Sequence, residues 1–297
     1  MVGKQERRYQ RMITVVLALI SLIMVIPLVL LVVASFTSNN EIVLHGYSFF
    51  PKELSLEAYR YIWNERAQVF HAYGITILVT AIGTTIGVMM TLLYAYVLAH
   101  EKFPGKTFLA FYLFFTMLFN GGLVPTYIMY TRYLHMKNTI PALIIPGLLM
   151  SAFNVILTRT YIQSNVPAAL SEAAKIDGAT EFQVFRKVVL PMCKPIIATV
   201  GLFAGLGYWN DWTNGLYYIT DTNKFSIQQL LNNMIKNIEF LSKNANSNIN
   251  LASVGGEIPQ ETVRMAIAIV GLLPILIVFP FVQKYFVKGI SIGAVKG

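Results

Sequence analysis

Residues 172–195 read EAAKIDGATEFQVFRKVVLPMCKP. This stretch decides the fold, because it is a short segment with many polar residues that lies between long apolar segments. Pro167 suits the first turn of a helix that leads into it. Gly178 stands where a residue in the left-handed conformation would end that helix. Thr180 then offers an N-cap, and Gln183 three residues later completes a capping box. The spacing predicts two short helices joined by a sharp turn, which we call the elbow.

The first helix of the elbow is amphipathic. Its apolar residues are Leu170, Ala173, Ala174 and Ile176, and its charged residues are Glu172, Lys175 and Asp177. The two neighbouring alanines offer a small, flat surface, and a helix of this kind suits docking into a groove on a partner. The alternative is a solvated loop helix whose charges only keep it soluble.

The composition around the elbow indicates a membrane protein. Hydrophobic residues make up 56% of the 297 residues and charged residues only 12%, against about 25% charged in a soluble domain. A membrane-spanning helix needs roughly 20 apolar residues. Six stretches meet this need, namely 12–35, 70–99, 108–130, 140–160, 195–219 and 262–286. We therefore expect an all-α, polytopic membrane protein with six transmembrane helices.

The lengths of these stretches suggest how the chain is organised. Basic residues precede the first stretch, but it is too long for a signal peptide and lacks a cleavage pattern, so we interpret it as a retained anchor. We expect the second helix to start a few residues late, because Tyr73-Gly74 is a weak start. The expected segments are an N-terminal tail (1–11), the first helix with an outer loop (12–69), a transmembrane core (70–286) with an inner loop (161–194) and an outer loop (218–261), and a C-terminal tail (287–297).

The distribution of charge predicts the orientation. If the N-terminus lies in the cytoplasm, the inner loops and tails hold fourteen of the 23 basic residues and five of the 14 acidic residues. The net charge of +9 then lies wholly on the inner side, as the positive-inside rule expects. Both termini are expected to be cytoplasmic. Nucleic-acid binding is not needed to explain the charge.

Several function classes lack support in the sequence. The single Cys193 excludes a disulfide framework, and the four scattered histidines show no metal-ligand spacing. A membrane-embedded enzyme would need a convergent catalytic constellation, and we find none, so we name no catalytic and no metal-binding residue. An ion-coupled transporter places functional charges inside the membrane, but Asp211 is the sole acid in an expected span. No phosphate-binding loop is present, so we expect no bound cofactor.

The elbow resembles the EAA motif of the permease subunits of binding-protein-dependent ABC importers. In that motif, E-A-A is followed by Gly and later by L-P. The resemblance covers nearly the whole chain and extends to carbohydrate permeases similar to the smaller maltose permease subunit, with the LplC-type oligosaccharide permeases as the nearest subgroup. It implies a type I ABC importer permease fold in a bacterial plasma membrane. The implied coupling residues are Glu172, Ala173, Ala174, Asp177, Gly178, Phe185 and Pro191.

The same resemblance implies the function and the partners. The chain would import sugars or oligosaccharides by ATP-driven alternating access, as a heterodimer with a second permease. Two ATPase subunits would bind ATP and Mg, and an external solute-binding lipoprotein would deliver the sugar. A peptide, an amino acid or another small solute remains the alternative cargo.

A polar and aromatic cluster near the end of the fifth stretch is the candidate substrate pathway. It comprises Tyr208, Trp209, Asn210, Asp211 and Trp212, with Asn120 and Tyr127 added from beside the Gly121-Gly122 break in the third stretch. Tyr208 and Trp212 are four residues apart, which predicts a shared helix face. Aromatic faces and polar groups suit a sugar ring. The alternative is an interfacial aromatic belt.

The C-terminal tail ends in FVKGISIGAVKG, which also resembles the family. In the maltose-type permease the matching tail inserts between the ATPase subunits. The implied contact residues here are Lys288, Gly289, Gly293, Lys296 and Gly297. A frayed terminus is the alternative.

Overall fold

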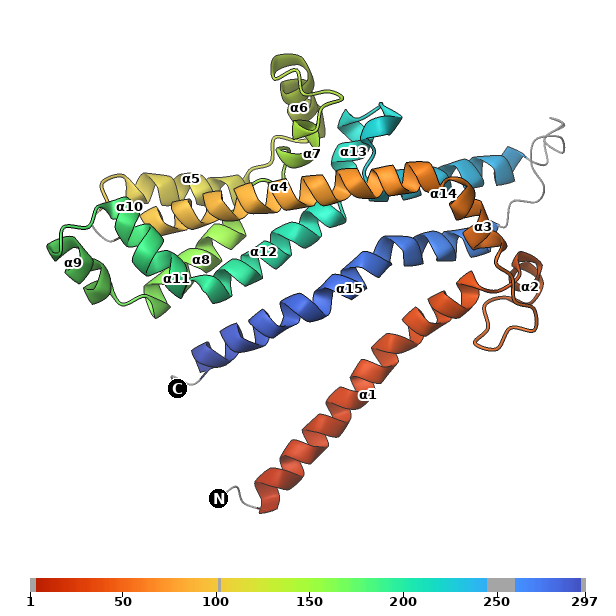
Figure 1. Cartoon of the computed structure of the whole chain (residues 1–297), viewed down its shortest axis with the longest axis horizontal. Helices are drawn as coiled ribbons and strands as arrows, with labels where there is room; N and C mark the ends of the chain where they lie inside the picture. Colours follow the sequence, from red (N-terminus) through yellow and green to blue (C-terminus); the bar gives the residue numbers. More distant parts are fainter. Residues whose placement is uncertain (1–3, 101–102, 245–259, 295–297) are drawn as a thin grey trace. The chain divides into compact units, whose positions relative to one another are not determined.

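The computed structural model describes residues 4–100, 103–244 and 260–294, and most of this backbone is helical (Figure 1). Within these residues, extended pairing is limited to one isolated antiparallel bridge between Thr37 and Leu54. The predicted all-α class is therefore confirmed. The chain divides into two compact units, one of residues 1–69 with 231–274 and the other of residues 70–230 with 275–297.

The first unit begins with α1 (Lys4–Ser35), which contains the first apolar stretch and starts within the expected N-terminal tail. Two short helices follow in the expected outer loop, α2 (Asn39–His45) and α3 (Glu57–Asn64). The hydroxyl groups of Ser35 and Tyr59 lie 2.8 Å apart, so a hydrogen bond ties the end of α1 to α3. The unit also includes most of α14 (Ile227–Asn244) and the first part of α15 (Gln260–Ala294).

Helix α14 lies within the expected outer loop over 218–261. Its apolar side chains recur every three to four residues, and the buried ones are Ile227, Leu230, Leu231, Met234 and Ile238. This spacing places them on one face of a helix. A search for long apolar stretches does not reveal this helix, because its buried apolar residues lie on one face only.

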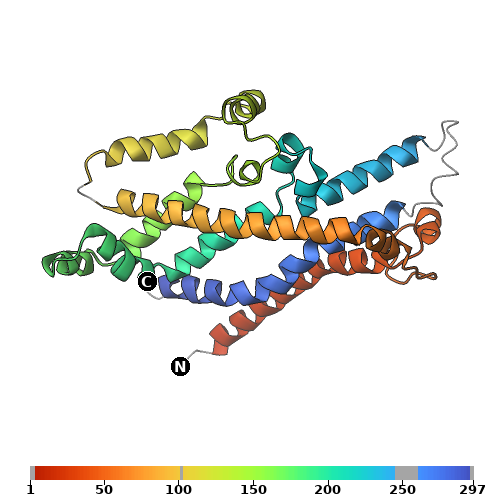
Figure 2. The same cartoon turned by 45° about the horizontal axis from the view of Figure 1, so that its top comes forward.

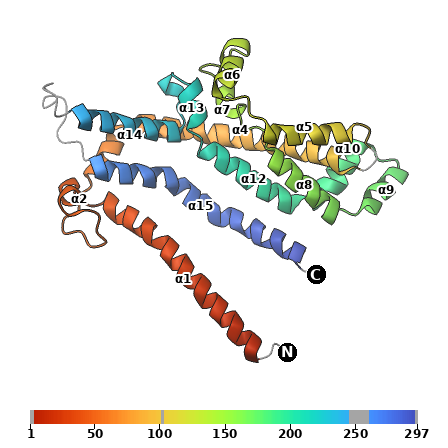
Figure 3. The same cartoon turned by 180° about the vertical axis from the view of Figure 1, so that it is seen from behind.

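The second unit is built around α4 (Arg66–Ala99), drawn in orange in Figure 2. The helix begins before Tyr73-Gly74, so the expected late start was wrong. Ala72 and Thr76 are buried on either side of Gly74, and packing of this kind overrides the weak helix propensity of glycine. Helices α8 (Ala152–Asn165) and α12 (Lys194–Trp209) run close to α4 in Figures 1 and 3.

The third, fourth and fifth stretches are broken rather than continuous helices. The third comprises α5 (Lys106–Leu118), α6 (Leu123–Ile128) and the π-helix η1 (Met129–Tyr133), with a bend of 115° after α5. The fourth comprises the single turn α7 (Pro141–Ile144) and α8. The fifth comprises α12 and α13 (Thr213–Tyr218). The break in the third stretch lies at Gly121-Gly122, as expected. The breaks in the fourth and fifth stretches were not expected, and they correct the prediction of continuous helices there.

The break in the fourth stretch has a local cause and a long-range one. Pro146 disfavours a helical residue before it, and Gly147 follows with a positive φ of 71°. Two side chains then satisfy the freed carbonyl groups. Tyr208 donates its hydroxyl to the carbonyl of Ile144 at 2.9 Å, and Asn214 donates its amide to that of Pro146 at 2.9 Å. Irregular backbone at membrane depth needs such partners.

Three helical segments in the described part of the chain are long and apolar enough to cross a membrane: residues Arg8–Ser35, Arg66–Ala99 and Glu261–Pro280. Up to five result if each of two bent helix pairs counts as one span. Helix α8, with 14 residues, is shorter than the roughly 20 residues of a full span. The count of six spans therefore stays a prediction.

Candidate functional site

The elbow has the backbone that its sequence predicts. Helix α9 (Ala168–Ile176) is followed by Gly178 with a φ of 85°. The amide of Gly178 donates to the carbonyl of Lys175 at 3.0 Å, and that of Ala179 to Ala174 at 2.9 Å. This pair of hydrogen bonds is the Schellman motif, which satisfies the last carbonyl groups of a helix. Pro167 stands at the N-cap of α9, one residue before the first helical position.

The second helix of the elbow begins with the predicted capping box. The amide of Gln183 donates to the Thr180 hydroxyl at 3.3 Å, and the amide of Thr180 donates to the Gln183 side chain at 2.8 Å. Three helical segments follow, α10 (Glu181–Val184), the π-helix η2 (Phe185–Val189) and α11 (Leu190–Met192). Figures 1 and 3 both show α9 beyond the C-terminal end of α4.

The base of the elbow is anchored in a hydrophobic core. Val184, Phe185 and Val189 are buried there, together with residues of α4, α5, α8 and α12. Phe185 is one of the predicted coupling residues, and its burial fixes the base of the elbow to the helices. Pro191, another predicted residue, is exposed in α11.

The tip of the elbow is exposed and leaves several groups without partners. Glu172 and Asp177 are exposed, and neither side chain makes a hydrogen bond or an ion pair with the described residues. Ile176 is 86% exposed and Phe182 is 65% exposed. Charged groups and large apolar side chains are thus presented together, which is typical of a surface that meets another protein.

A polar cluster that the sequence analysis missed joins the elbow to α4. Glu181 forms an ion pair with Lys175 and accepts a hydrogen bond of 2.9 Å from the Tyr96 hydroxyl. His100 Nε2 lies 3.3 Å from Lys175 Nζ and 3.8 Å from a Glu181 oxygen. The hydrogen bond from Lys175, more than that from Tyr96, holds the pKa of Glu181 below its ordinary value. The sequence gives no signal of this contact, because Tyr96 and Glu181 are 85 residues apart.

The predicted pathway residues at the end of α12 do not share one helix face. The helix ends at Trp209, and Asp211 accepts hydrogen bonds from the amides of Thr213 and Asn214 at 3.0 and 3.3 Å, which starts α13. Tyr208 is buried, whereas Trp212 is exposed. The expected shared face was wrong because the helix breaks between these two residues.

The other pathway residues lie in separate local settings. The side-chain amide of Asn210 donates to the Leu206 carbonyl at 2.9 Å. The Trp209 ring lies 6.3 Å from that of Tyr73. Asn120 is exposed and its side chain accepts from the Gly122 amide at 2.9 Å, and the Tyr127 ring stacks 5.9 Å from that of Tyr218. A role for these residues in transport stays a prediction.

The predicted tail contacts fall at the end of α15. The backbone of Lys288, Gly289 and Gly293 is helical, because α15 continues to Ala294. Lys296 and Gly297 lie outside the described residues.

Comparison with known proteins identifies the kind of molecule that carries this elbow. Residues 98–292 match the family described as "Binding-protein-dependent transport system inner membrane component". The chain is 35% identical to the polygalacturonan/rhamnogalacturonan transport system permease protein YtcP of Bacillus subtilis, over 99% of this chain and all of YtcP. It is 34% identical to the protein LplC of the same organism, over 93% of this chain and 90% of LplC.

A solved structure has the same fold. A chain of a bacterial ABC transporter involved in the import of the acidic polysaccharide alginate superposes with a TM-score of 0.77 and 28% sequence identity. The match covers 96% of this chain and 99% of that chain. The expected ABC importer permease fold is therefore confirmed.

Proposed function

Since this chain belongs to the family of binding-protein-dependent transport system inner membrane components, we propose that it is the permease subunit of an ABC importer for oligosaccharides. The relatives support this cargo, because their names include polygalacturonan, rhamnogalacturonan and arabinooligosaccharides. The chain spans nearly the whole length of these relatives. The family is one of transport permeases and not of enzymes.

The observation that carries this proposal is the contrast within the elbow between a buried base and an unpartnered tip. Phe185 and Val189 fix the base in the core. Glu172 and Ile176 present a carboxylate and an apolar side chain outward. A partner ATPase with a basic residue in a groove would pair with Glu172 through a charge-assisted hydrogen bond. The elbow would then act as the lever between ATP hydrolysis and the helices.

Membership of the family supports our proposal for the remaining partners. A second permease completes the membrane part, two ATPase subunits bind ATP and Mg, and an external lipoprotein delivers the sugar. Both termini lie in the cytoplasm of a bacterium, and the segment from Lys288 to Gly297 contacts the ATPase subunits. Closure of the ATPase pair on ATP moves the elbow, and the permease pair opens outward to accept the sugar.

Uptake by cells that express the complete import system tests the cargo. Radiolabelled rhamnogalacturonan oligosaccharides, raffinose and a tripeptide would be compared with and without depletion of ATP. We expect ATP-dependent uptake of a saccharide and none of the tripeptide above the level of cells that lack this chain. ATP-dependent uptake of the tripeptide alone would contradict the proposal.

A further inference from the structure

Four polar side chains tie the elbow to the C-terminal end of α4, and one of them is a histidine. Tyr96 lies in α4 and His100 directly after it, Lys175 lies in the last turn of α9, and Glu181 is the first residue of α10. The four form one connected group, because Glu181 contacts each of the other three. We call this group the latch. It contains none of the predicted coupling residues.

The contact between His100 and Lys175 requires a neutral imidazole. His100 Nε2 lies 3.3 Å from Lys175 Nζ. An ammonium group only donates hydrogen bonds, so Nε2 must be the acceptor and the ring proton must sit on Nδ1. The Tyr96 ring, one turn earlier, lies 4.9 Å from the imidazole in an edge-to-face arrangement, and this contact holds the imidazole in place.

A proton on Nε2 would reverse the character of this contact. The imidazolium would present a donor and a positive charge to the Lys175 ammonium, and like charges at this separation repel each other. The Glu181 carboxylate, 3.8 Å from Nε2, carries one negative charge and can balance one of the two cations. The position of Lys175 beside α4 is therefore favoured while His100 is neutral and disfavoured when it is charged.

The surroundings of His100 make it the member of the latch that senses pH. The titratable groups that face it come from three helices, namely Tyr96 of α4, Lys175 of α9 and Glu181 of α10. Histidine is the side chain whose charge ordinarily changes between about pH 5 and pH 8. The side chain of His100 is 32% exposed, so protons from the solvent reach it. Glu101 and Lys102, which follow in the chain, lie outside the described residues.

Loss of the Lys175 contact would loosen only one half of the elbow. Glu181 would still accept a hydrogen bond from the Tyr96 hydroxyl, now at 2.9 Å, and the base of the elbow would stay buried in the core. In the described part of the chain, Lys175 carries the polar contact from α9 to the end of α4. Helix α9 also carries Glu172, so a change at the latch reaches the surface that we propose for the ATPase.

We propose that His100 is a positioning residue of the elbow and makes its attachment sensitive to pH. The neutral form holds α9 against α4, whereas protonation releases α9 and weakens the coupling of ATP hydrolysis to import. The latch is therefore closed at the upper end of the range in which histidine titrates, and it opens as the pH falls through that range. This inference rests on the proposed function, because it assumes that an ATPase binds the elbow.

The pH profile of coupling tests this role. The complete import complex would be reconstituted in liposomes, with rhamnogalacturonan oligosaccharides or raffinose as cargo, whichever the wild type imports. We expect the ATP hydrolysed per saccharide to rise about twofold to threefold from about pH 8 to about pH 6, the size of an exposed charge contact. His100→Gln should remove this rise, because its side-chain oxygen also accepts from Lys175 and takes up no proton.

Two further variants bracket the effect. His100→Arg carries a positive charge at every pH, so its ratio should stay at the high value that the wild type reaches at low pH. His71→Gln is the matched control, because it makes the same change at an exposed histidine near the other end of α4. Its side-chain amide can still donate to the Asn223 carbonyl that His71 contacts, so its profile should follow that of the wild type.

Spin labels on the elbow provide a measurement that does not depend on transport. Cys193 is the one cysteine of the chain and is buried, so labels would attach to Ala169→Cys in α9 and Thr85→Cys in α4, both at exposed positions. With the other subunits made cysteine-free, pulsed electron paramagnetic resonance gives the distribution of distances between the labels. We expect this distribution to broaden from about pH 8 to about pH 6, and not to broaden when His100→Gln is added.

The outcomes separate this inference from the proposed function. A rise that persists in His100→Gln, a rise that is lost equally in His71→Gln, or a distance distribution that does not change with pH would overturn the role of the latch while the importer stands. A wild-type ratio that is constant over this range would overturn it as well. A purified wild type that retains no ATPase, or that imports no saccharide, would instead count against the proposed function.

Discussion

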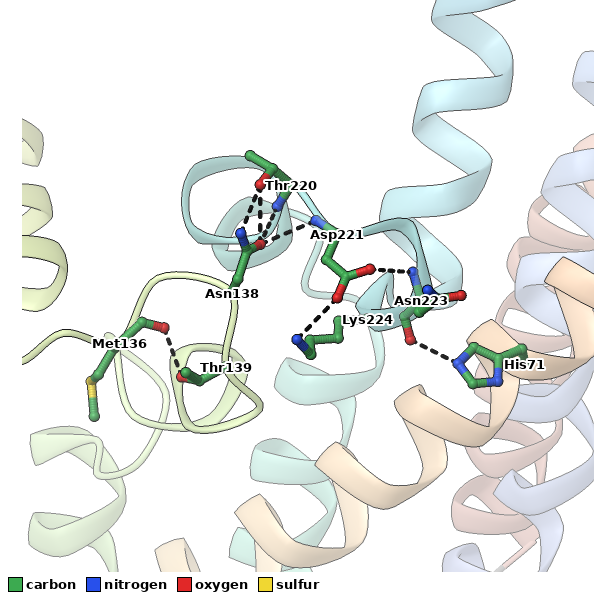
Figure 4. Close-up of polar contacts among 8 residues, drawn as sticks. All are labelled: His71, Met136, Asn138, Thr139, Thr220, Asp221, Asn223 and Lys224. Atoms are coloured by element: carbon green, nitrogen blue, oxygen red, sulfur yellow. Dashed lines mark hydrogen bonds and ion pairs between the residues drawn. The ribbon is translucent and has the colours of Figure 1, made fainter.

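The two ends of α4 carry polar clusters of opposite character. Near its start, the side chain of Asn138 joins the segment before α7 to the residues after α13 (Figure 4). Its amide oxygen accepts from the amides of Thr220 and Asp221 at 2.6 and 3.1 Å, and its amide nitrogen donates to the Thr220 hydroxyl at 2.8 Å. His71 of α4 contacts the Asn223 carbonyl at 2.7 Å. We call this group the turn cluster.

The elbow, at the other end of α4, differs because its outermost charged groups have no partners among the described residues. In the turn cluster, Asp221 accepts from the Asn223 amide at 3.1 Å and pairs with Lys224 at 3.0 Å, so its carboxylate is satisfied within the chain. Glu172 in the elbow has no such partner among the described residues. A satisfied cluster holds a fold together, whereas an unpartnered one is available to another molecule. The comparison indicates a role in stability for the turn cluster and supports the docking role that we propose for the elbow.

The largest expected effect is that of Gly178→Asp in the elbow. The backbone there has a φ of 85°, which costs an L residue about 1–2 kcal/mol, and the new carboxylate adds a charge beside Asp177. We expect loss of most sugar uptake, at least tenfold, together with weaker retention of the ATPase. Gly178→Asn, which tolerates this conformation better, should retain more uptake. Equal, normal uptake by both variants would contradict a docking role for the turn.

The next effect is that of Asn138→Ala in the turn cluster. Asn138 has a positive φ of 59° and three groups bond to its amide oxygen. We expect a loss of about 1–3 kcal/mol in stability, measured as a lower thermal midpoint of the purified complex, with ATPase retention unchanged. Asn138→Gly keeps the left-handed backbone and isolates the loss of the amide. A variant that releases the ATPase at full stability would break the comparison.

The smallest effect is that of Glu181→Gln at the base of the elbow. The ion pair with Lys175 is largely exposed, so solvent screening limits its contribution to below about 1 kcal/mol. We expect a modest rise, less than about threefold, in ATP hydrolysed per sugar imported, because the elbow is held less firmly. Lys187→Gln, an exposed residue of η2, serves as the matched loss of charge. Identical ratios in both variants would remove Glu181 from the coupling path.

The lowered pKa of Glu181 fixes how this contribution depends on pH. Its folded pKa lies below the ordinary value of 4.5, so the stabilisation is complete above that value. It is lost as the pH falls through the lowered folded pKa. Coupling should therefore be insensitive to this group between pH 6 and 8, and a change confined to that range would point to another group.

The parts of the fold that the sequence predicted are those set by neighbouring residues. The turn at Gly178 and the capping box of Thr180 and Gln183 depend on contacts three to five residues apart, so local rules suffice. The repeating apolar positions of α14 also carried a local signal, which a search for continuous apolar stretches does not detect. The correct class of fold followed from the long apolar stretches.

The parts that could not be predicted depend on contacts between distant residues. The break at Pro146 is stable because Tyr208 and Asn214 reach the freed carbonyl groups from 64 and 68 residues away. The same break brings the carbonyl oxygen of Leu149 so close to Gly87 of α4 that a Cβ atom there would lie 2.6 Å from it. The pairing of Glu181 with Tyr96 is likewise invisible in the sequence.

Retention of the ATPase by Glu172→Lys tests the central claim most directly. The tagged permease would be purified from membranes, and the ATPase that stays bound would be quantified beside sugar uptake in the same cells. Glu65→Lys, the same reversal of charge at an exposed acid between α3 and α4, is the matched control. We predict that Glu172→Lys inserts normally but loses the ATPase or its coupling to uptake, while Glu65→Lys behaves as the wild type. Full uptake with a normally bound ATPase in Glu172→Lys would contradict the assignment of the elbow.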